Sequence, residues 1–165
     1  MGKRSSEYVR REKDFYPTPP EAVVPLVDYL QPNCHYIEPC VGDGALVRAL
    51  SQYGHHCVGQ YDLPTDVCTT QYDTQGAHCF ITNPPWDRRI LHPTIDNLRR
   101  QLPTWLLFDA DWAHTVQAKE YIKYCMMIIS VGRVKWIAES KHTGKDNAAW
   151  YLFVNNPTVT TFIGR

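Results

Sequence analysis

The segment from His35 to Asp62 constrains the fold most strongly. It predicts a strand, a glycine turn at 42–44, a helix and a second strand, in that order. Apolar side chains recur at helical spacing after the turn, and Gly54 is typical of a helix C-cap. The second strand, 57–62, ends in a carboxylate. This order is the signature of a nucleotide-binding strand–helix–strand unit.

The rest of the chain alternates between apolar segments that predict strands and amphipathic segments that predict helices. Further strands are expected at 78–82, 105–109, 126–137 (interrupted at Gly132-Arg133) and 148–154, and further helices at 18–30, from about 90 or 93 to 102, and at 115–124. Residues 63–77 leave room only for a short second crossover and a short third strand. This alternation predicts an α/β fold with a mostly parallel central sheet flanked by helices.

The first helix carries both a start signal and an interruption. Thr18-Pro19-Pro20-Glu21 reads as a capping box with proline at the first helical position. Apolar residues at 23, 24, 27 and 30 then give one face. Pro25 lies in the interior, so this helix is expected to be short or kinked.

Composition and charge limit the class of protein. With 165 residues, 44% of them hydrophobic and 21% charged, the chain resembles one ordinary globular domain. Its net charge is zero, which argues against a free-standing nucleic-acid binder with a strongly basic surface. The sequence has no signal-peptide core and no apolar run near the ~18 residues of a membrane span. A soluble cytoplasmic protein is expected, in the host cytoplasm if the chain is phage-encoded.

The cysteines and histidines do not form a metal-binding pattern. The six cysteines are scattered without a C-x-x-C pair, and we interpret them as buried, reduced thiols. The seven histidines do not fall at zinc-ligand spacings with these cysteines. No metal site is therefore expected.

Asn83-Pro84-Pro85-Trp86 directly follows the predicted strand 78–82. Proline has no N–H and a rigid φ, so the turn offers acceptors, the Asn83 side-chain oxygen and the Pro84 carbonyl, with few donors nearby. Trp86 adds a flat aromatic surface. This combination suits a planar NH2 group whose two hydrogens are bonded while its face is stacked. A Pro-Pro turn after a strand is equally compatible with an ordinary loop.

The glycine turn indicates a cofactor without phosphates. Glycines after a first strand let the backbone approach a ligand closely, and in dinucleotide-binding proteins that ligand is a pyrophosphate. Here the turn is Gly42-Asp43-Gly44 and not G-x-G-x-x-G, and Asp43 would repel a pyrophosphate. NAD is therefore disfavoured. S-adenosylmethionine fits better, because its sulfonium and ammonium groups favour nearby carboxylates.

Three motifs in this order resemble the class I S-adenosylmethionine-dependent amino-methyltransferases, most closely the small phage-type DNA adenine N6-methyltransferases. They are Phe15-Tyr16-Pro17-Thr18-Pro19-Pro20, Glu38-Pro39-Cys40-Val41-Gly42-Asp43-Gly44 and Asn83-Pro84-Pro85-Trp86. Residues 133–136 and 141–150 are similar to the corresponding stretch of those phage enzymes. The resemblance covers residues 15 to about 154 and implies a Rossmann-like class I methyltransferase fold.

The resemblance implies a set of cofactor-binding residues for S-adenosylmethionine. They are Tyr16, Thr18, Pro19, Glu38, Pro39, Gly42, Gly44, Asp62 and Asp66. Glu38 would lie near the methionine amino group, and Asp62 would bind the ribose hydroxyls. Asp66 would contact the adenine amino group, although residues around it depart from the family's usual length. A solvated loop carboxylate is the alternative for each acid.

The resemblance also implies an acceptor site with DNA as partner and RNA as a further possibility. Its catalytic residues would be Asn83, Pro84, Pro85 and Trp86, with Trp86 stacked on the base. Basic residues that could meet phosphates are Arg88, Arg89, Lys141 and Lys145, for which a solvated charged loop is the alternative.

The expected domain organisation is simple. Residues 1–14 are interpreted as a basic N-terminal tail, either solvated or a phosphate-binding arm, and residues 15–165 as one methyltransferase domain. Predicted strands occupy nearly all of the sequence after Trp86, so no separate target-recognition domain is expected. Short loops, a homodimer partner or a specificity subunit would then read the target sequence.

The function predicted from these features is methyl transfer from S-adenosylmethionine to the exocyclic N6 of adenine in DNA. The same chemistry on RNA or on a protein glutamine amide is an alternative. The resemblance does not single out adenine, because the family's Asn-Pro-Pro-aromatic motif also occurs in enzymes that act on cytosine N4 or on a protein glutamine amide. A non-catalytic cofactor-binding subunit is another alternative. The intact glycine turn and intact Asn83–Trp86 motif disfavour the latter.

Overall fold

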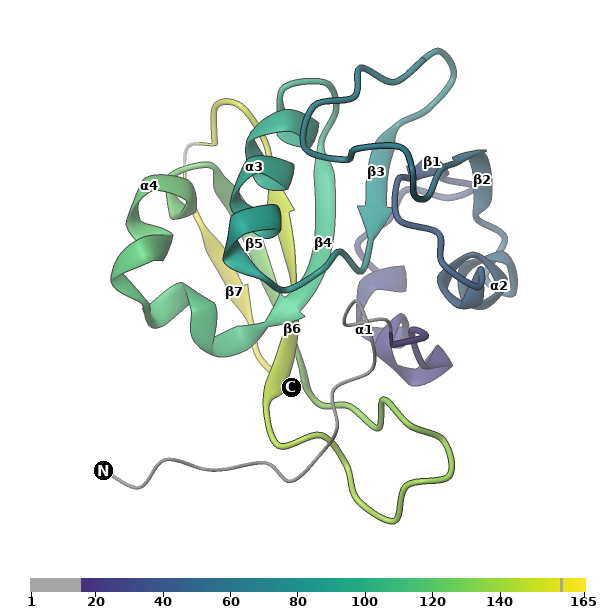
Figure 1. Cartoon of the computed structure of the whole chain (residues 1–165), viewed down its shortest axis with the longest axis vertical. Helices are drawn as coiled ribbons and strands as arrows, with labels where there is room; N and C mark the ends of the chain where they lie inside the picture. Colours follow the sequence, from purple (N-terminus) through teal and green to yellow (C-terminus); the bar gives the residue numbers. More distant parts are fainter. Residues whose placement is uncertain (1–15, 158) are drawn as a thin grey trace.

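The computed structural model describes residues 16–157 and 159–165, which build one seven-stranded sheet (Figure 1). The strands are β1 (His35–Glu38), β2 (His56–Gln60), β3 (Cys79–Thr82), β4 (Thr104–Asp109), β5 (Cys125–Arg133), β6 (Asn147–Phe153) and β7 (Thr161–Ile163), in the order β2-β1-β3-β4-β6-β5-β7. Among these strands β6 is antiparallel to its neighbours and every other pairing is parallel. The predicted α/β fold with a mostly parallel sheet is confirmed.

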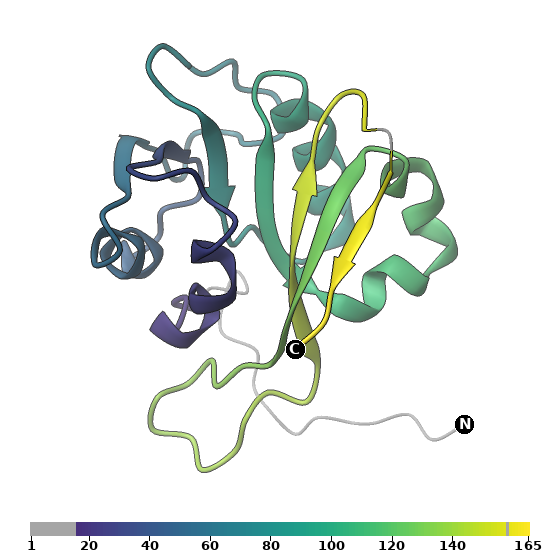
Figure 2. The same ribbon diagram turned by 180° about the vertical axis from the view of Figure 1, so that it is seen from behind.

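Helices cover both faces of the sheet (Figures 1 and 2). They are η2 (Pro20–Ala22), α1 (Val24–Val27), α2 (Ala45–Ser51), α3 (Arg88–Arg99), η3 (Ala110–His114), η4 (Val116–Ala118) and α4 (Lys119–Ile122). Successive strand residues point to opposite faces, so Ile81 and Leu107 pack with η2, α1 and α2, whereas Phe80 and Leu106 pack with α3, η3 and η4. Each such fully buried side chain stabilises the fold by about 1.5–3 kcal/mol.

Helix α3 begins and ends slightly earlier than its sequence pattern predicts. It starts at Arg88 because the Asp87 side chain caps it, accepting a hydrogen bond from the Arg89 N–H at 2.9 Å. Ile95 and Leu98, predicted to face inward, are fully buried.

The N-terminal helix is short and broken, as Pro25 predicts, but the predicted capping box is wrong. The N-cap of η2 is Pro19, without a side-chain cap bond. The Thr18 hydroxyl instead accepts a hydrogen bond from Asn83 Nδ2 at 3.2 Å. The Thr18 hydroxyl, which the local pattern assigned to capping the helix, is therefore engaged in a contact with a residue distant in sequence.

The predicted third strand and second crossover within 63–77 are wrong, because this segment forms neither strand nor helix. Side chains from α3 and from the turn after it hold this segment in place. Asn97 Nδ2 donates to the carbonyls of Val67 and Thr70, both at 2.9 Å, and Gln101 Oε1 accepts from Tyr72 N at 2.9 Å. With no strand beyond it in the described chain, β2 is the edge of the sheet.

Three other boundaries differ from the predictions. The predicted helix 115–124 is split into η4 and α4. The predicted strand 126–137 ends at Arg133, because residues 134–146 form a loop that Gly144 N closes on Val134 O at 2.8 Å. Strand β7 was not predicted.

All six cysteines are free thiols, and Cys34 Sγ lies 3.6 Å from Cys79 Sγ. Within the described residues, no helix has both the length and the apolar character needed to cross a bilayer.

Candidate functional site

Four parallel strands, β2, β1, β3 and β4, end at the same edge of the sheet, and an open cavity of about 1160 Å³ lies there. Most of the residues predicted to form the site line this cavity. They are Tyr16, Thr18, Glu38, Pro39, Gly42, Asp62, Asp66, Asn83, Pro84, Pro85, Trp86 and Lys145. Those that do not line it are Pro19, Gly44, Arg88, Arg89 and Lys141. The structure thus gathers side chains that are up to 129 positions apart in the sequence into one cavity.

The turn after β1 depends on glycine at two positions. Gly42 and Gly44 have φ angles of 52° and 79°, which lie in the left-handed region that side chains with a Cβ rarely adopt. Asp43 between them is tied back to α2, since its Oδ1 accepts from Ala45 N at 2.9 Å. Gly42 lies on the cavity wall, and Gly44, although outside it, sets the direction of the turn.

Glu38 is a buried carboxyl at the end of β1, only 1% exposed. Its pKa is raised to about 8, chiefly by burial and to a smaller extent by nearby Asp62, while the hydrogen bond from Cys40 N to Glu38 Oε1 at 3.0 Å limits the rise. Glu38 is therefore mostly protonated at neutral pH while no cation is beside it. A cationic group in the cavity would favour the ionised form.

The two aspartates after β2 differ in how they are engaged. Asp62 is exposed, and its backbone carbonyl accepts from Thr65 N at 2.9 Å. Asp66 accepts from Cys68 N at Oδ1 and from the Thr69 hydroxyl at Oδ2, both at 2.9 Å, and these bonds lower its pKa. Both Asp66 oxygens therefore already serve the local turn.

The Asn83 side chain has one orientation fixed by its partners. Nδ2 donates to Thr18 Oγ1 at 3.2 Å and to Tyr16 O at 3.5 Å. Oδ1 accepts from Trp86 Nε1 at 3.2 Å. Because the carbonyl of Tyr16 only accepts and the indole N–H only donates, the reversed amide would place like groups together. Asn83 Oδ1 therefore faces the indole of Trp86, and Nδ2 faces Thr18 and Tyr16.

The cavity wall also includes residues that were not predicted from the sequence, chiefly Trp136, Gly144 and Asp146. Trp136 packs edge-to-face with Trp86, with ring centroids 5.4 Å apart. A Cβ on Gly144 would lie 2.8 Å from Val134 O and 3.1 Å from the Trp136 ring, so only glycine fits there without displacement. In the sequence, a glycine within this polar loop was the one feature that could have indicated a close approach of the loop to Trp136.

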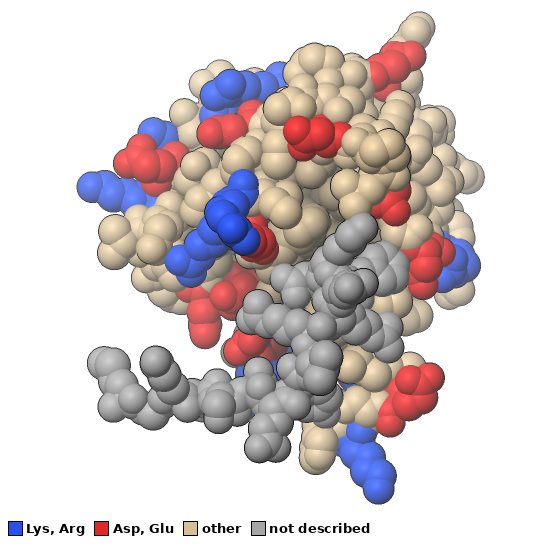
Figure 3. Space-filling view, viewed as in Figure 1, with Lys and Arg blue, Asp and Glu red and all other residues tan. Residues whose placement is uncertain are grey.

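The basic residues near the cavity do not form a positive surface. Arg89 is paired with Asp87 at 2.6 Å, and beside Lys145 lies the carboxylate of Asp146. Blue and red atoms are interspersed on the face shown in Figure 3. Arg88 and Lys141 are exposed outside the cavity. Electrostatic attraction of a polyanion by the described residues is therefore weak.

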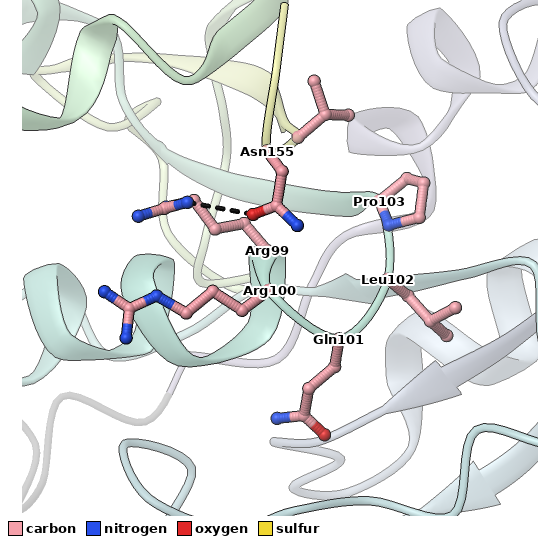
Figure 4. Close-up of a pocket in the computed structure, with 7 residues that line it drawn as sticks. Arg99, Arg100, Gln101, Leu102, Pro103 and Asn155 are labelled. Atoms are coloured by element: carbon pink, nitrogen blue, oxygen red, sulfur yellow. Dashed lines mark hydrogen bonds between the residues drawn. The ribbon is translucent and has the colours of Figure 1, made fainter.

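A second, smaller hollow of about 240 Å³ lies at the end of α3, near the start of β4 (Figure 4). Its most buried charge, Arg99, is already satisfied by Asp96 at 2.7 Å and Asn155 Oδ1 at 3.0 Å, and it lies over the Tyr124 ring. We interpret this cluster as a structural tie between α3 and the segment after β6. In the described chain, no group of three or more His, Cys, Asp or Glu is arranged to hold a metal ion.

Comparisons with known proteins identify the fold. No family model and no curated protein matches the chain. Among solved structures, the type I restriction-modification methyltransferase subunit from Streptococcus thermophilus matches with a TM-score of 0.55 and 10% identity over 90% of this chain and 47% of that chain. The M protein of the type I restriction enzyme EcoKI matches with a TM-score of 0.52 and 12% identity, over 87% of this chain and 44% of that one.

A putative class I S-adenosylmethionine-dependent methyltransferase from Listeria monocytogenes matches with a TM-score of 0.54 and 9% identity, over 96% of this chain and 68% of that chain. The chain spans less than half the length of the two restriction-modification proteins. These likenesses concern the arrangement of strands and helices. The chain has the α/β fold of the class I methyltransferases.

Proposed function

We propose that this chain is an S-adenosylmethionine-dependent methyltransferase that modifies the exocyclic N6 of adenine in DNA. One observation carries the proposal: the oriented oxygen of Asn83 and the carboxyls of Glu38 and Asp62 belong to the same cavity. An acceptor for an amine and a set of acids suited to a cationic cofactor are thus brought together. Two solved structures of similar fold are subunits of restriction-modification systems, which supports DNA as the acceptor.

The cofactor side fits S-adenosylmethionine by its charge. Among the described residues that line the cavity between positions 38 and 66, the ionisable side chains are four acids and Cys40, with no lysine or arginine to hold a phosphate. Glu38 would hold the methionine amino group, which supplies the cation that a buried carboxyl requires. Asp62 would accept from the ribose hydroxyls, and Gly42 permits close approach. When bound, the cofactor supplies an electrophilic methyl group on its sulfonium.

The remaining cofactor residues have assigned roles in this proposal. Tyr16, Thr18 and Pro19 would pack near the methionine end, with Thr18 and Tyr16 also holding Asn83. Asp66 would contact the adenine amino group through lone pairs that its turn leaves free. Pro39 and Gly44 would shape the wall and its turn.

The acceptor side is suited to activate a weak nucleophile. The lone pair of an adenine amino nitrogen is delocalised into the ring. Hydrogen bonds from its two hydrogens to Asn83 Oδ1 and the Pro84 carbonyl would localise that pair and direct it toward the methyl group. Catalysis then comes from positioning and electrostatics, without a covalent intermediate.

Access to a base in a duplex requires that the base be flipped out of the stack. The Trp86 ring would contact the flipped base, with stacking worth about 1–3 kcal/mol. Arg88, Arg89, Lys141 and Lys145 would meet phosphates, with Lys145 the nearest to the cavity. Because Arg89 is paired with Asp87, we expect its contribution to phosphate binding to be small.

A methyl-transfer experiment with three acceptor classes tests the proposal. The purified chain is incubated with methyl-labelled S-adenosylmethionine and with DNA, RNA or a protein mixture, and Asn83→Ala serves as the matched control. Label should enter DNA with the unmodified chain only. Label in RNA or in protein amides would move the assignment to the alternative acceptor, and cofactor binding without transfer to any class would identify a non-catalytic subunit.

A further inference from the structure

The indole N–H of Trp86 makes a contact that stacking on a base does not require. Nε1 lies 3.2 Å from Asn83 Oδ1 and 3.2 Å from Leu107 O, so one donor is shared between the neighbouring motif residue and strand β4. A phenylalanine ring also stacks but carries no donor. The indole nitrogen of Trp86 therefore makes hydrogen bonds that are independent of any stacking by the ring face.

This contact completes the restraint of the Asn83 amide. Thr18 and Tyr16 hold its nitrogen, and Trp86 holds its oxygen. A carbonyl-type oxygen has two lone pairs, so Oδ1 can accept from Trp86 and still accept from an incoming amine. Without the indole donor, only bonds of 3.2 and 3.5 Å at the nitrogen would resist rotation of the amide.

We propose that Trp86 is a positioning residue whose indole N–H holds Asn83 Oδ1 in place for the acceptor amine. The proposal rests on the proposed function, which makes Asn83 Oδ1 the acceptor for that amine. The Leu107 carbonyl also accepts from the indole and so fixes it to β4. The orientation of the Asn83 side chain is therefore held by the sheet as well as by its own loop.

Ordinary packing is the competing explanation, and it requires a conservative test. Trp86 is partly buried. It packs against buried residues from both faces of the sheet and on Trp136, so Trp86→Ala would lose packing as well as the donor. Site-specific replacement of Trp86 by benzothienylalanine keeps the shape and face of the ring and substitutes sulfur for the N–H. It isolates the donor.

We expect this replacement to lower kcat about tenfold, the equivalent of one hydrogen bond of about 1.4 kcal/mol, with KM and cofactor affinity within about twofold. The matched control is the same replacement at Trp112, whose Nε1 donates to His92 Nε2 at 3.0 Å and which does not line the cavity. That variant should lose comparable thermal stability and keep its kcat. An unchanged kcat in the Trp86 variant, or equal losses in both variants, would overturn the proposal.

A spectroscopic measurement tests the contact without relying on activity. In protein labelled with ¹⁵N-tryptophan, Asn83→Leu should shift the indole N–H signal of Trp86 and leave that of Trp112 in place. An unmoved Trp86 signal overturns the positioning role. If the unmodified chain transfers no methyl group while this shift is present, the proposed function fails but the contact stands.

Discussion

The two sides of the cavity differ in how their polar groups are satisfied. On the acceptor side, both ends of the Asn83 amide are already bonded, to Thr18 and to Trp86. On the cofactor side, Glu38 is buried with a raised pKa and Asp62 is exposed, and no cationic side chain among the described residues forms an ion pair with either. The proposed acceptor side is therefore pre-organised by the protein, whereas the proposed cofactor side would be completed electrostatically by a bound cation.

Removing the oriented acceptor should have the largest effect. Asn83→Ala should lower methyl transfer by about a hundredfold or more, because the amine loses the group that aligns its lone pair. Cofactor affinity should change only a few-fold, since the amide contacts the acceptor and not the donor. Single-turnover rates with saturating cofactor measure the first quantity and calorimetry the second. Near-normal turnover in this variant would remove Asn83 from the site.

Loss of the exposed Asp62 carboxylate should affect cofactor binding and not the acceptor side of the cavity. Asp62→Ala should weaken S-adenosylmethionine binding more than tenfold, because hydrogen bonds to a charged group are worth about 1.5–3 kcal/mol. Asp66→Ala should cost less, since both oxygens of Asp66 already serve the turn at Cys68 and Thr69. Equal losses in calorimetric titrations of the two variants would contradict this ranking, and tighter binding of NAD than of S-adenosylmethionine would remove the cofactor assignment.

The pH dependence of binding should report Glu38. A cationic ligand favours the ionised carboxyl, so binding releases the proton that Glu38 carries below its pKa of about 8. Affinity should therefore rise with pH between 6 and 8, by at most about tenfold per pH unit for one proton, and level off above 8. The slope should vanish in Glu38→Gln. A slope that persists in that variant would assign the proton to another group.

The same shift has the opposite sign for the free protein. The folded state holds the proton of Glu38 to higher pH than the unfolded state does, so the free energy of unfolding should fall as pH rises from about 4.5 to about 8. Glu38→Gln should remove this part of the decline. Denaturant titrations at several pH values, without ligand, measure it.

The smallest effect is expected for the lysines near the cavity. Lys145→Ala should weaken binding to all DNA sequences about equally and reduce the salt slope by about 0.9 for one lost phosphate contact. Lys141→Ala is the comparison variant and should reduce the salt slope less, because Lys141 lies in the same loop but outside the cavity wall. A change in which sequence is methylated, with an unaltered salt slope, would show that Lys145 reads bases instead.

The same contrast explains what the sequence could predict. Most of the proposed cofactor side comes from the continuous segment 35–62, whose strand pattern, glycine turn and acids can be recognised in the sequence alone. The acceptor side depends on contacts distant in sequence. Thr18 was assigned to a helix cap because nothing local reveals its bond to Asn83, and Trp136 was missed because its place depends on how Gly144 closes the loop.

The predicted third strand failed for a related reason. Residues 63–77 are weakly patterned, and several of their backbone groups bond to the side chains of Asn97 on α3 and Gln101 just after it. Such side-chain bonds replace a ladder of strand hydrogen bonds without leaving a periodic signal in the segment itself. The mostly parallel sheet was nevertheless implied by the alternation of strands and helices.

The most direct test of adenine N6 methylation by this chain is the position of the transferred methyl group. DNA is incubated with the purified chain and deuterated-methyl S-adenosylmethionine, digested to nucleosides and analysed by mass spectrometry beside an Asn83→Ala reaction. We expect deuterated N6-methyladenine with the unmodified chain and about a hundredfold less, or none, with the variant. Label on a ring carbon or ring nitrogen, or N6-methyladenine at equal levels in both reactions, would contradict this expectation.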